Sequence, residues 1–302
     1  MLATLAAGVA LIGCAALPGE AGPHPVVYSF AYGIGVAATT PHANPPGAND
    51  FGCEPTAAHP RPVVLAHGTF GNMTDSWQAL SARLANAGYC VFALDYGGPA
   101  DGQLFGTGDI RDSAAQLRGF VDRVLASTGA DKVDIVGHSQ GGMMPRWYIE
   151  FLGGDRTVHT LVGLSPSNHG TTFHGLASLA AYFPGGAGGV FGTGCVACTQ
   201  QFLPSTFIDT LNEGGDTVPG VSYTVIATRY DEVVTPYQSQ FLTGPGVTNI
   251  LLQDGCALDL TDHLGIVYDP IALDHVMNAL DPAHAVPARC TAVLPGVGGP
   301  GL

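Results

Sequence analysis

Residues 133–142 read VDIVGHSQGG, and this stretch decides the fold. The apolar run 133–136 is typical of a strand buried on both faces, and a helix is expected over 140–152. Between them the letters GHSQG match G-x-S-x-G, a sharp strand-to-helix turn that lifts a serine above the edge of a sheet. The turn is so tight that glycine is required beside the serine. The stretch therefore predicts a strand, a nucleophile turn at Ser139 and a helix.

Apolar runs and amphipathic segments alternate on both sides of this stretch. Short apolar runs predict buried strands, and longer segments with one apolar face predict helices. The expected strands cover 62–66, 89–94, 133–136, 160–164, 223–227 and 249–252, and the expected helices cover 75–87, 109–127, 140–152 and 270–280. This order predicts an α/β fold with a mostly parallel central sheet and helices on both faces.

Two segments depart from the alternation. Residues 18–60 are rich in Pro and Gly and are expected to form an extended lead-in wrapped on the domain. Residues 169–216 are apolar and rich in Gly and aromatic residues, which favours a cap-like or lid-like insertion. Because neither repeats nor a separating linker occur, residues 21–302 are predicted to form one domain.

A serine hydroxyl needs a base, and the base needs a carboxylate to orient it. With this kind of turn the chain order is serine, acid, histidine. Six histidines follow Ser139, and His263 lies on the loop between the last expected strand and the last helix. His275 lies inside that helix, so His263 is the predicted base.

The acid is expected after the penultimate strand. Asp231 follows the strand at 223–228 and is the predicted acid. Its neighbour Glu232 is the alternative, while Asp254 and Asp259 come only after the next strand.

Two backbone N–H groups are needed to hold the oxyanion that forms when an ester or amide carbonyl is attacked. One is expected from Gln140, the residue after the serine. The other is expected from the loop after the first strand, where residues 67–71 read HGTFG, and we assign it to Phe70 or Thr69.

Charge and histidine spacing exclude other classes of protein. The net charge is −14, from 24 acidic and 10 basic residues, and no basic run is present. This excludes the electrostatic footprint of a nucleic-acid binder. The eleven histidines contain no H-E-x-x-H pattern, so we expect neither a metal nor a cofactor.

The N-terminus predicts export. Residues 2–17 are apolar and Ala-rich, and residues 1–20 are expected to be a signal peptide although no Lys or Arg precedes the apolar run. Residues 11–14 read LIGC, which resembles a lipoprotein signal. The expected location is extracellular, or the cell envelope if Cys14 is lipidated.

Cysteine usage agrees with export. Without Cys14 six cysteines remain, an even number that is typical of proteins with disulfides. Their order and spacing suggest the pairs Cys53–Cys90, Cys195–Cys198 and Cys256–Cys290. A redox or zinc pair at 195–198 is the alternative, but no second CxxC exists.

Four pieces of the sequence, in this order, resemble the secreted class 2 lipases of bacteria, a family best represented in actinobacteria. They are AHGTFG at 66–71, GHSQGG at 137–142, YDEVVTP at 230–236 and DHLG at 262–265. The resemblance covers about residues 50–280 and is weakest over 169–216. It implies the α/β-hydrolase fold, triacylglycerol lipase or esterase activity through an acyl-enzyme, and no metal. The partner it implies is a lipid ester or a lipid–water interface, with no stable protein partner.

Other functions stay open at this point. An acyltransferase or a polyesterase would use the same three residues, whereas a non-catalytic protein on this fold usually lacks one of them. A redox protein built on the CxxC would not need Ser139.

The insertion is expected to line the acyl pocket. Its substrate-binding candidates are Phe173, Leu176, Phe183 and Phe191. The alternative is that this apolar face packs on the sheet, as helix stripes usually do.

Overall fold

The computed structural model describes residues 23–172, 174–175, 177 and 194–299. Within these ranges six strands form one sheet in the order β2-β1-β3-β4-β5-β6, and all neighbouring strands are parallel. The strands are β1 (Val63–Ala66), β2 (Val91–Leu94), β3 (Val133–His138), β4 (Val158–Leu164), β5 (Ser222–Ala227) and β6 (Val247–Leu251). The predicted α/β class with a parallel sheet is confirmed.

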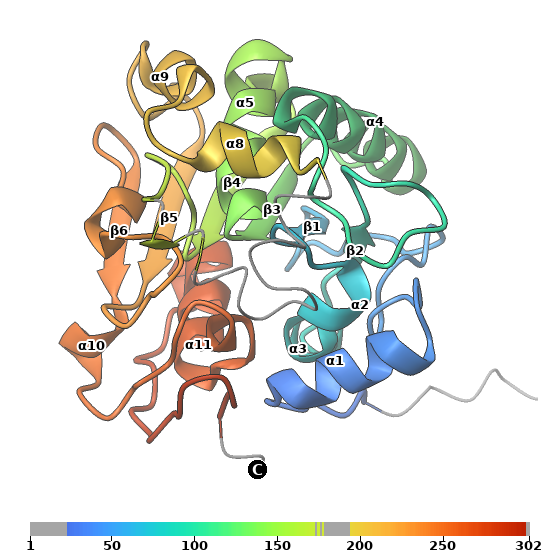
Figure 1. The fold of residues 1–302 in the computed structure, drawn as a ribbon. Coiled ribbons are helices and arrows are strands. Elements are labelled where there is room, and N and C mark those ends of the chain that lie inside the picture. Colours follow the sequence, from blue (N-terminus) through green and yellow to red (C-terminus); the bar gives the residue numbers. More distant parts are fainter. Residues whose placement is uncertain (1–22, 173, 176, 178–193, 300–302) are drawn as a thin grey trace, which may run out of the picture.

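Helices cover both faces of the sheet (Figure 1). One buried cluster joins the sheet to α4 (Ile110–Thr128), α5 (Gln140–Phe151), α8 (Val196–Gln201) and α9 (Thr206–Asn212). The other joins it to α3 (Gln78–Asn86) and α11 (Pro270–Leu280). Within β1, Val64 belongs to the first cluster and its neighbour Leu65 to the second, as the period of two along a strand requires.

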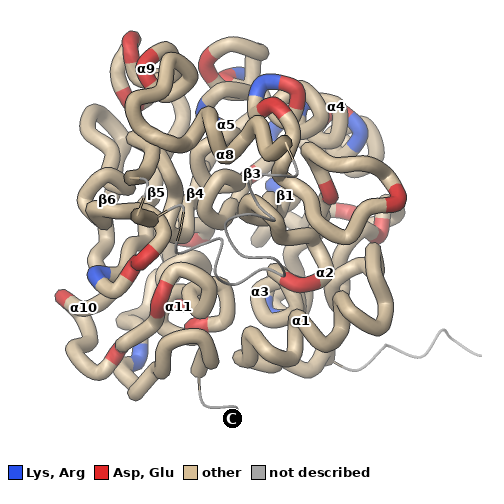
Figure 2. Tube along the Cα trace, viewed as in Figure 1, with Lys and Arg blue, Asp and Glu red and all other residues tan. Residues whose placement is uncertain are grey.

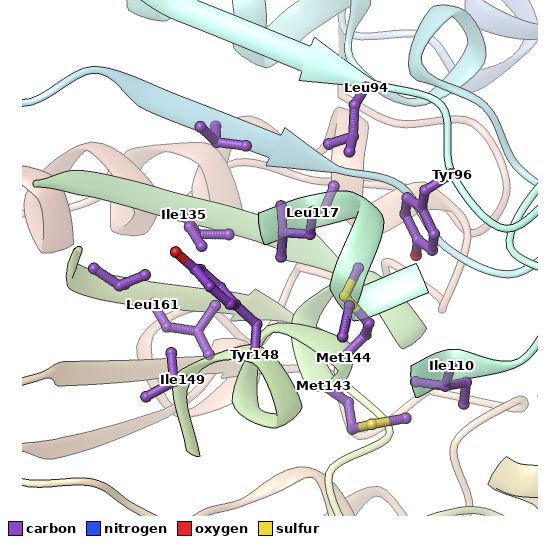
Figure 3. Close-up of a cluster of buried hydrophobic side chains, with 14 of the residues drawn as sticks. Leu94, Tyr96, Ile110, Leu117, Ile135, Met143, Met144, Tyr148, Ile149 and Leu161 are labelled. Atoms are coloured by element: carbon purple, nitrogen blue, oxygen red, sulfur yellow. The ribbon is translucent and has the colours of Figure 1, made fainter. Parts of the chain in front are cut away.

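The first cluster forms where α4 and α5 lie over the middle of the sheet (Figure 3). Leu117 of α4 and Tyr148 of α5 pack there with Ile135 of β3, and all three are almost completely buried. Because α5 begins directly after Ser139, this packing fixes the helix that carries the nucleophile turn.

Two predictions about helices need correction. The helix expected over 75–87 is divided into α2 (Met73–Ser76) and α3, because Trp77 leaves helical geometry with φ −120° and ψ 16°. The lead-in expected to be extended contains a helix, α1 (Phe30–Thr39), which begins at an N-cap where the hydroxyl of Ser29 accepts the Tyr32 N–H. A serine cap of this kind accepts a hydrogen bond from one of the backbone N–H groups that have no acceptor within the helix.

Shorter elements complete the described chain. They are α10 (Leu252–Gly255) and the 3-10 turns Gly154–Arg156, Tyr237–Gln240, Gly265–Tyr268 and Pro282–His284. None of the helices in the described ranges combines the length and apolar character needed to cross a bilayer.

Several predictions fall on residues outside the described ranges. These are the signal peptide at 1–20 with Cys14, and the pocket candidates Phe173, Leu176, Phe183 and Phe191. Of the insertion at 169–216, the structure describes mainly α8 and α9.

The parallel sheet decides where polar loops meet. The loop after β1, Ser139 after β3 and Asp231 after β5 all follow the carboxyl ends of strands. In an open parallel sheet these ends lie along one edge, where ligands bind.

Candidate active site

The turn at Ser139 has the strained backbone that the sequence predicts. Ser139 lies at φ 54° and ψ −122°, and its N–H donates to the Leu164 carbonyl at 2.9 Å. A Cβ on Gly137 would overlap the Gly141 carbonyl, and one on Gly141 would overlap the Ala66 carbonyl. The glycines are therefore required by close backbone approach.

His263 and Asp231 form a buried pair. The imidazole Nδ1 lies 2.8 Å from Oδ2 of Asp231, and both side chains are almost completely buried. Asp231 lies on the loop after β5, and His263 lies on the loop between α10 and the turn Gly265–Tyr268. Ser139 directly follows β3, so the three residues proposed from the sequence lie on three separate segments of the chain.

The Asp231 carboxylate is held by four donors. Oδ1 accepts the N–H groups of Val233 and Val234 at 2.9 and 2.7 Å. Oδ2 accepts the His263 ring and the Gln240 side-chain amide, the latter at 2.9 Å. Four donors on two oxygens fix the orientation of the carboxylate.

Glu232 is placed differently from Asp231. Its Oε2 accepts the backbone N–H of His263 at 3.4 Å, whereas the imidazole Nδ1 is bonded to Asp231. Burial raises the pKa of Glu232. The geometry thus favours Asp231 as the residue that orients the imidazole.

Two opposing effects act on the pKa of His263. Burial disfavours the charged imidazolium, but the charge and hydrogen bond of Asp231 outweigh it, so that the pKa is raised. An imidazolium stabilised in this way is what a general base requires once it has taken up a proton.

His138, the residue before Ser139, contacts both the ring and the backbone carbonyl of His263. Its Nε2 donates to the His263 carbonyl at 2.8 Å, and the two ring centroids are 4.8 Å apart. Burial and the neighbouring imidazole lower the pKa of His138 to about 3, so the ring is neutral. It carries its proton on Nε2, as a donor to a carbonyl must.

Hydrogen bonds in the loop after β1 distinguish the two candidate oxyanion donors, Thr69 and Phe70. Phe70 lies at φ 64°, and its N–H donates to the Phe105 carbonyl at 2.8 Å. No acceptor among the described residues takes the Thr69 N–H. Gln140 is the first residue of α5, and helices leave their first N–H groups without an internal partner. The arrangement favours Thr69 and Gln140 over Phe70 as donors.

A residue that the sequence reasoning missed connects these two donors. The Gln201 amide, at the end of α8, donates to Thr69 Oγ1 at 3.0 Å and to Gln140 Oε1 at 3.2 Å. Its own oxygen accepts the Ser167 hydroxyl at 2.8 Å. No local pattern marks a glutamine that bonds across 132 positions of the chain.

The six cysteines in the described part of the chain form three disulfides, Cys53–Cys90, Cys195–Cys198 and Cys256–Cys290. These are the pairs expected from order and spacing. The CxxC disulfide lies at the start of α8, where Cys195 is the N-cap. It is thus next to the helix that carries Gln201.

Comparison with known proteins adds a family to this geometry. A family model described as lipase (class 2) matches residues 60–271 of the chain. A triacylglycerol lipase of Pseudarthrobacter phenanthrenivorans is 37% identical over 97 residues, covering 30% of this chain and 28% of that protein. A triacylglycerol lipase of Burkholderia plantarii is 37% identical over 97 residues, covering 30% of this chain and 25% of that protein. The matched stretch spans less than a third of the length of these curated relatives.

Two solved structures have a similar fold. Aspergillus fumigatus lipase B matches with a TM-score of 0.64 at 24% identity, over 82% of this chain and 57% of that chain. The mature form of Bacillus licheniformis lipase BlEst2 matches with a TM-score of 0.56 at 19% identity, over 75% of this chain and 94% of that chain. At these identities the likeness shows the fold alone.

Proposed function

The chain belongs to the class 2 lipase family, within the α/β-hydrolase fold, and from that premise we propose that it hydrolyses carboxylic esters of lipids through an acyl-enzyme. The nucleophile is Ser139, the base is His263 and the orienting acid is Asp231. One observation carries the proposal, namely the buried 2.8 Å contact between His263 Nδ1 and Asp231 Oδ2 beside a strained nucleophile turn.

The proposed reaction has two steps. Ser139 Oγ attacks the ester carbonyl while His263 takes its proton, and the N–H groups of Thr69 and Gln140 hold the oxyanion. The bond between the carbonyl carbon and the alcohol oxygen then breaks, and His263 gives its proton to that oxygen. Water activated by His263 releases the fatty acid and restores Ser139.

Triacylglycerol is the proposed natural class of substrate, because two relatives bear that activity in their names. The proposed binding partner is a lipid ester or a lipid–water interface. Acidic residues are spread over several elements and basic ones are few (Figure 2). The net charge of −14 favours neutral esters over anionic surfaces.

Export and domain organisation are part of the same proposal. Residues 1–20 serve as signal peptide and 21–302 form the mature domain, or Cys14 anchors the protein through a lipid. Three disulfides support an oxidising compartment.

The test measures hydrolysis of p-nitrophenyl esters with acyl chains from acetyl to stearoyl, together with a triglyceride, by the wild type and Ser139→Ala. We expect the variant to lose about 10⁶ in kcat with an unchanged melting temperature. A folded variant that keeps a tenth of the wild-type activity would refute the assignment of Ser139.

A further inference from the structure

A pocket of about 230 Å³ opens beside the oxyanion loop. Its lining comes from α1, the loop 68–71, Asp75 and Ser76, His138, and the segment after the predicted base; α1 contributes Phe30 and Ile34, and that segment contributes Leu264 and Val267. The Ser76 hydroxyl already donates to the Asp75 carboxylate at 2.7 Å. The remaining wall is mostly apolar, so the pocket suits a hydrocarbon group.

The pocket lies on the His263 side of the site. His138 lines it, and this ring both contacts the His263 ring and bonds to its carbonyl. Leu264, the residue after His263, lines it as well. In ester hydrolysis the base must deliver its proton to the alcohol oxygen, so the groups attached to that oxygen lie on the base's side.

Helix α1 packs closely against the other residues of the pocket wall at Gly33. A Cβ on Gly33 would overlap the Tyr268 hydroxyl and approach the Asp75 carbonyl, which are themselves joined at 2.5 Å. The Phe30 ring meets the Tyr268 ring edge-on, with the ring centroids 6.2 Å apart. The backbone N–H of Phe30 donates to the Val297 carbonyl. The glycine therefore lets α1 lie directly against α2 and the turn after His263, as Figure 1 shows for α1 and α2.

The helix lies outside the part of the chain that the family model matches, residues 60–271. Ile34 is 45% exposed although it is a large apolar side chain, and it lines the pocket. The volume is below the roughly 300–1,000 Å³ of pockets that hold drug-sized ligands, so the occupant is a short chain.

We propose that this pocket binds the apolar part of the ester's alcohol, and that Phe30 and Ile34 of α1 select alcohols by size. The inference rests on the proposed ester hydrolysis and deepens it by naming a specificity-determining element.

The test fills the pocket with Ile34→Trp and uses Tyr32→Trp as control, because Tyr32 is equally exposed on α1 but does not line the pocket. One series of substrates varies the alcohol of butyrate esters from methyl to hexyl, and a second varies the acyl chain of methyl esters. In Ile34→Trp the ratio of kcat/KM between hexyl and methyl butyrate should fall about tenfold or more, since small size differences in apolar pockets change rates by about 10–200-fold. The ratio between methyl octanoate and methyl butyrate should stay unchanged.

A change in the acyl series without one in the alcohol series would overturn the proposal, as would an equal effect of Tyr32→Trp. Saturation-transfer NMR with 1-butanol gives a second readout that does not need hydrolysis. Ser139→Ala protein and its Tyr32→Trp derivative should bind 1-butanol, and the Ile34→Trp derivative should not. Butanol binding with no ester hydrolysis by the wild type would refute the proposed function while supporting the pocket, and absence of binding in all three proteins would refute the pocket.

Discussion

Replacing Asp231 by Asn exchanges one oxygen of the buried acid for an NH₂ group of nearly equal size. The amide oxygen must occupy the Oδ1 position, because the N–H groups of Val233 and Val234 both point at it. The NH₂ group then occupies the Oδ2 position, which faces His263 Nδ1 at 2.8 Å. A donor at that place forces the imidazole to carry its proton on Nε2.

An imidazole with its proton on Nε2 cannot accept the Ser139 proton. We expect kcat to fall by about 10⁴, as for the corresponding change in serine proteases, which corresponds to about 5.5 kcal/mol of transition-state stabilisation. The fold should tolerate the change. In the described part of the chain Gln240 Oε1 is buried without a hydrogen-bond partner, while Nε2 donates to Asp231. Turning that amide over lets Oε1 accept the second new N–H, so the free energy of unfolding should change by only about 1 kcal/mol.

The assay measures kcat for p-nitrophenyl butyrate over pH, together with the melting temperature. The wild type loses activity on the acid side when the imidazole of His263 is protonated. Because Asp231 contributes to the raised pKa of His263, the acid limb of the residual activity should move to lower pH in Asp231→Asn. Glu232→Gln is the matched control and should change kcat less than about tenfold, since Glu232 bonds to the backbone N–H of His263 and the imidazole Nδ1 is bonded to Asp231. A larger loss in the control than in Asp231→Asn would show that the acid is misassigned.

Three further outcomes are expected. Gln201→Leu should lower kcat by about tenfold, because it removes the hydrogen bonds from the Gln201 amide to the side chains of Thr69 and Gln140. Thr199 is exposed on the same helix, and Thr199→Ala should have no effect on kcat. Equal rates in the two variants would contradict this role of Gln201. Asp269 is buried, and burial and Asp259 raise its pKa to about 8. The stability linked to its carboxyl group is therefore fully present below the unfolded pKa of about 4 and is lost as pH rises through the raised pKa. Urea unfolding from about pH 5 to about pH 9 should therefore show a loss of stability that Asp269→Asn removes, and parallel curves for the two proteins would oppose this reading. Thiol titration of the denatured, unreduced mature protein should detect no free thiol from the six described cysteines, and two or more would argue against three disulfides.

The sequence predicted the strands well because a parallel sheet buries each strand on both faces, which leaves continuous apolar runs such as 63–66 and 91–94. The nucleophile turn was equally predictable, since the overlap at Gly137 and Gly141 leaves no other residue type possible. Both signals stand in a few consecutive residues of the sequence.

Features that depend on distant contacts were not predictable. The sequence left Thr69 and Phe70 as equal candidates, because the choice depends on the Phe105 carbonyl that occupies the Phe70 N–H. Helix α1 was missed because its sequence, FAYGIGVAAT, is apolar all round and contains two glycines, so no amphipathic period marks it. It packs at Gly33 against Tyr268, which is far away in the chain.

The proposed base and nucleophile share one support, which explains how segments 125 residues apart in the chain keep a fixed geometry. His263 is held at its ring by Asp231 and at its carbonyl by His138, which is the residue directly before Ser139. A shift of the base loop would therefore break a bond to the nucleophile turn itself. Because burial keeps the His138 ring neutral, this bond does not change over the pH range in which His263 titrates. The proposed base can thus gain and lose its proton during each catalytic cycle while its backbone carbonyl stays bonded to His138.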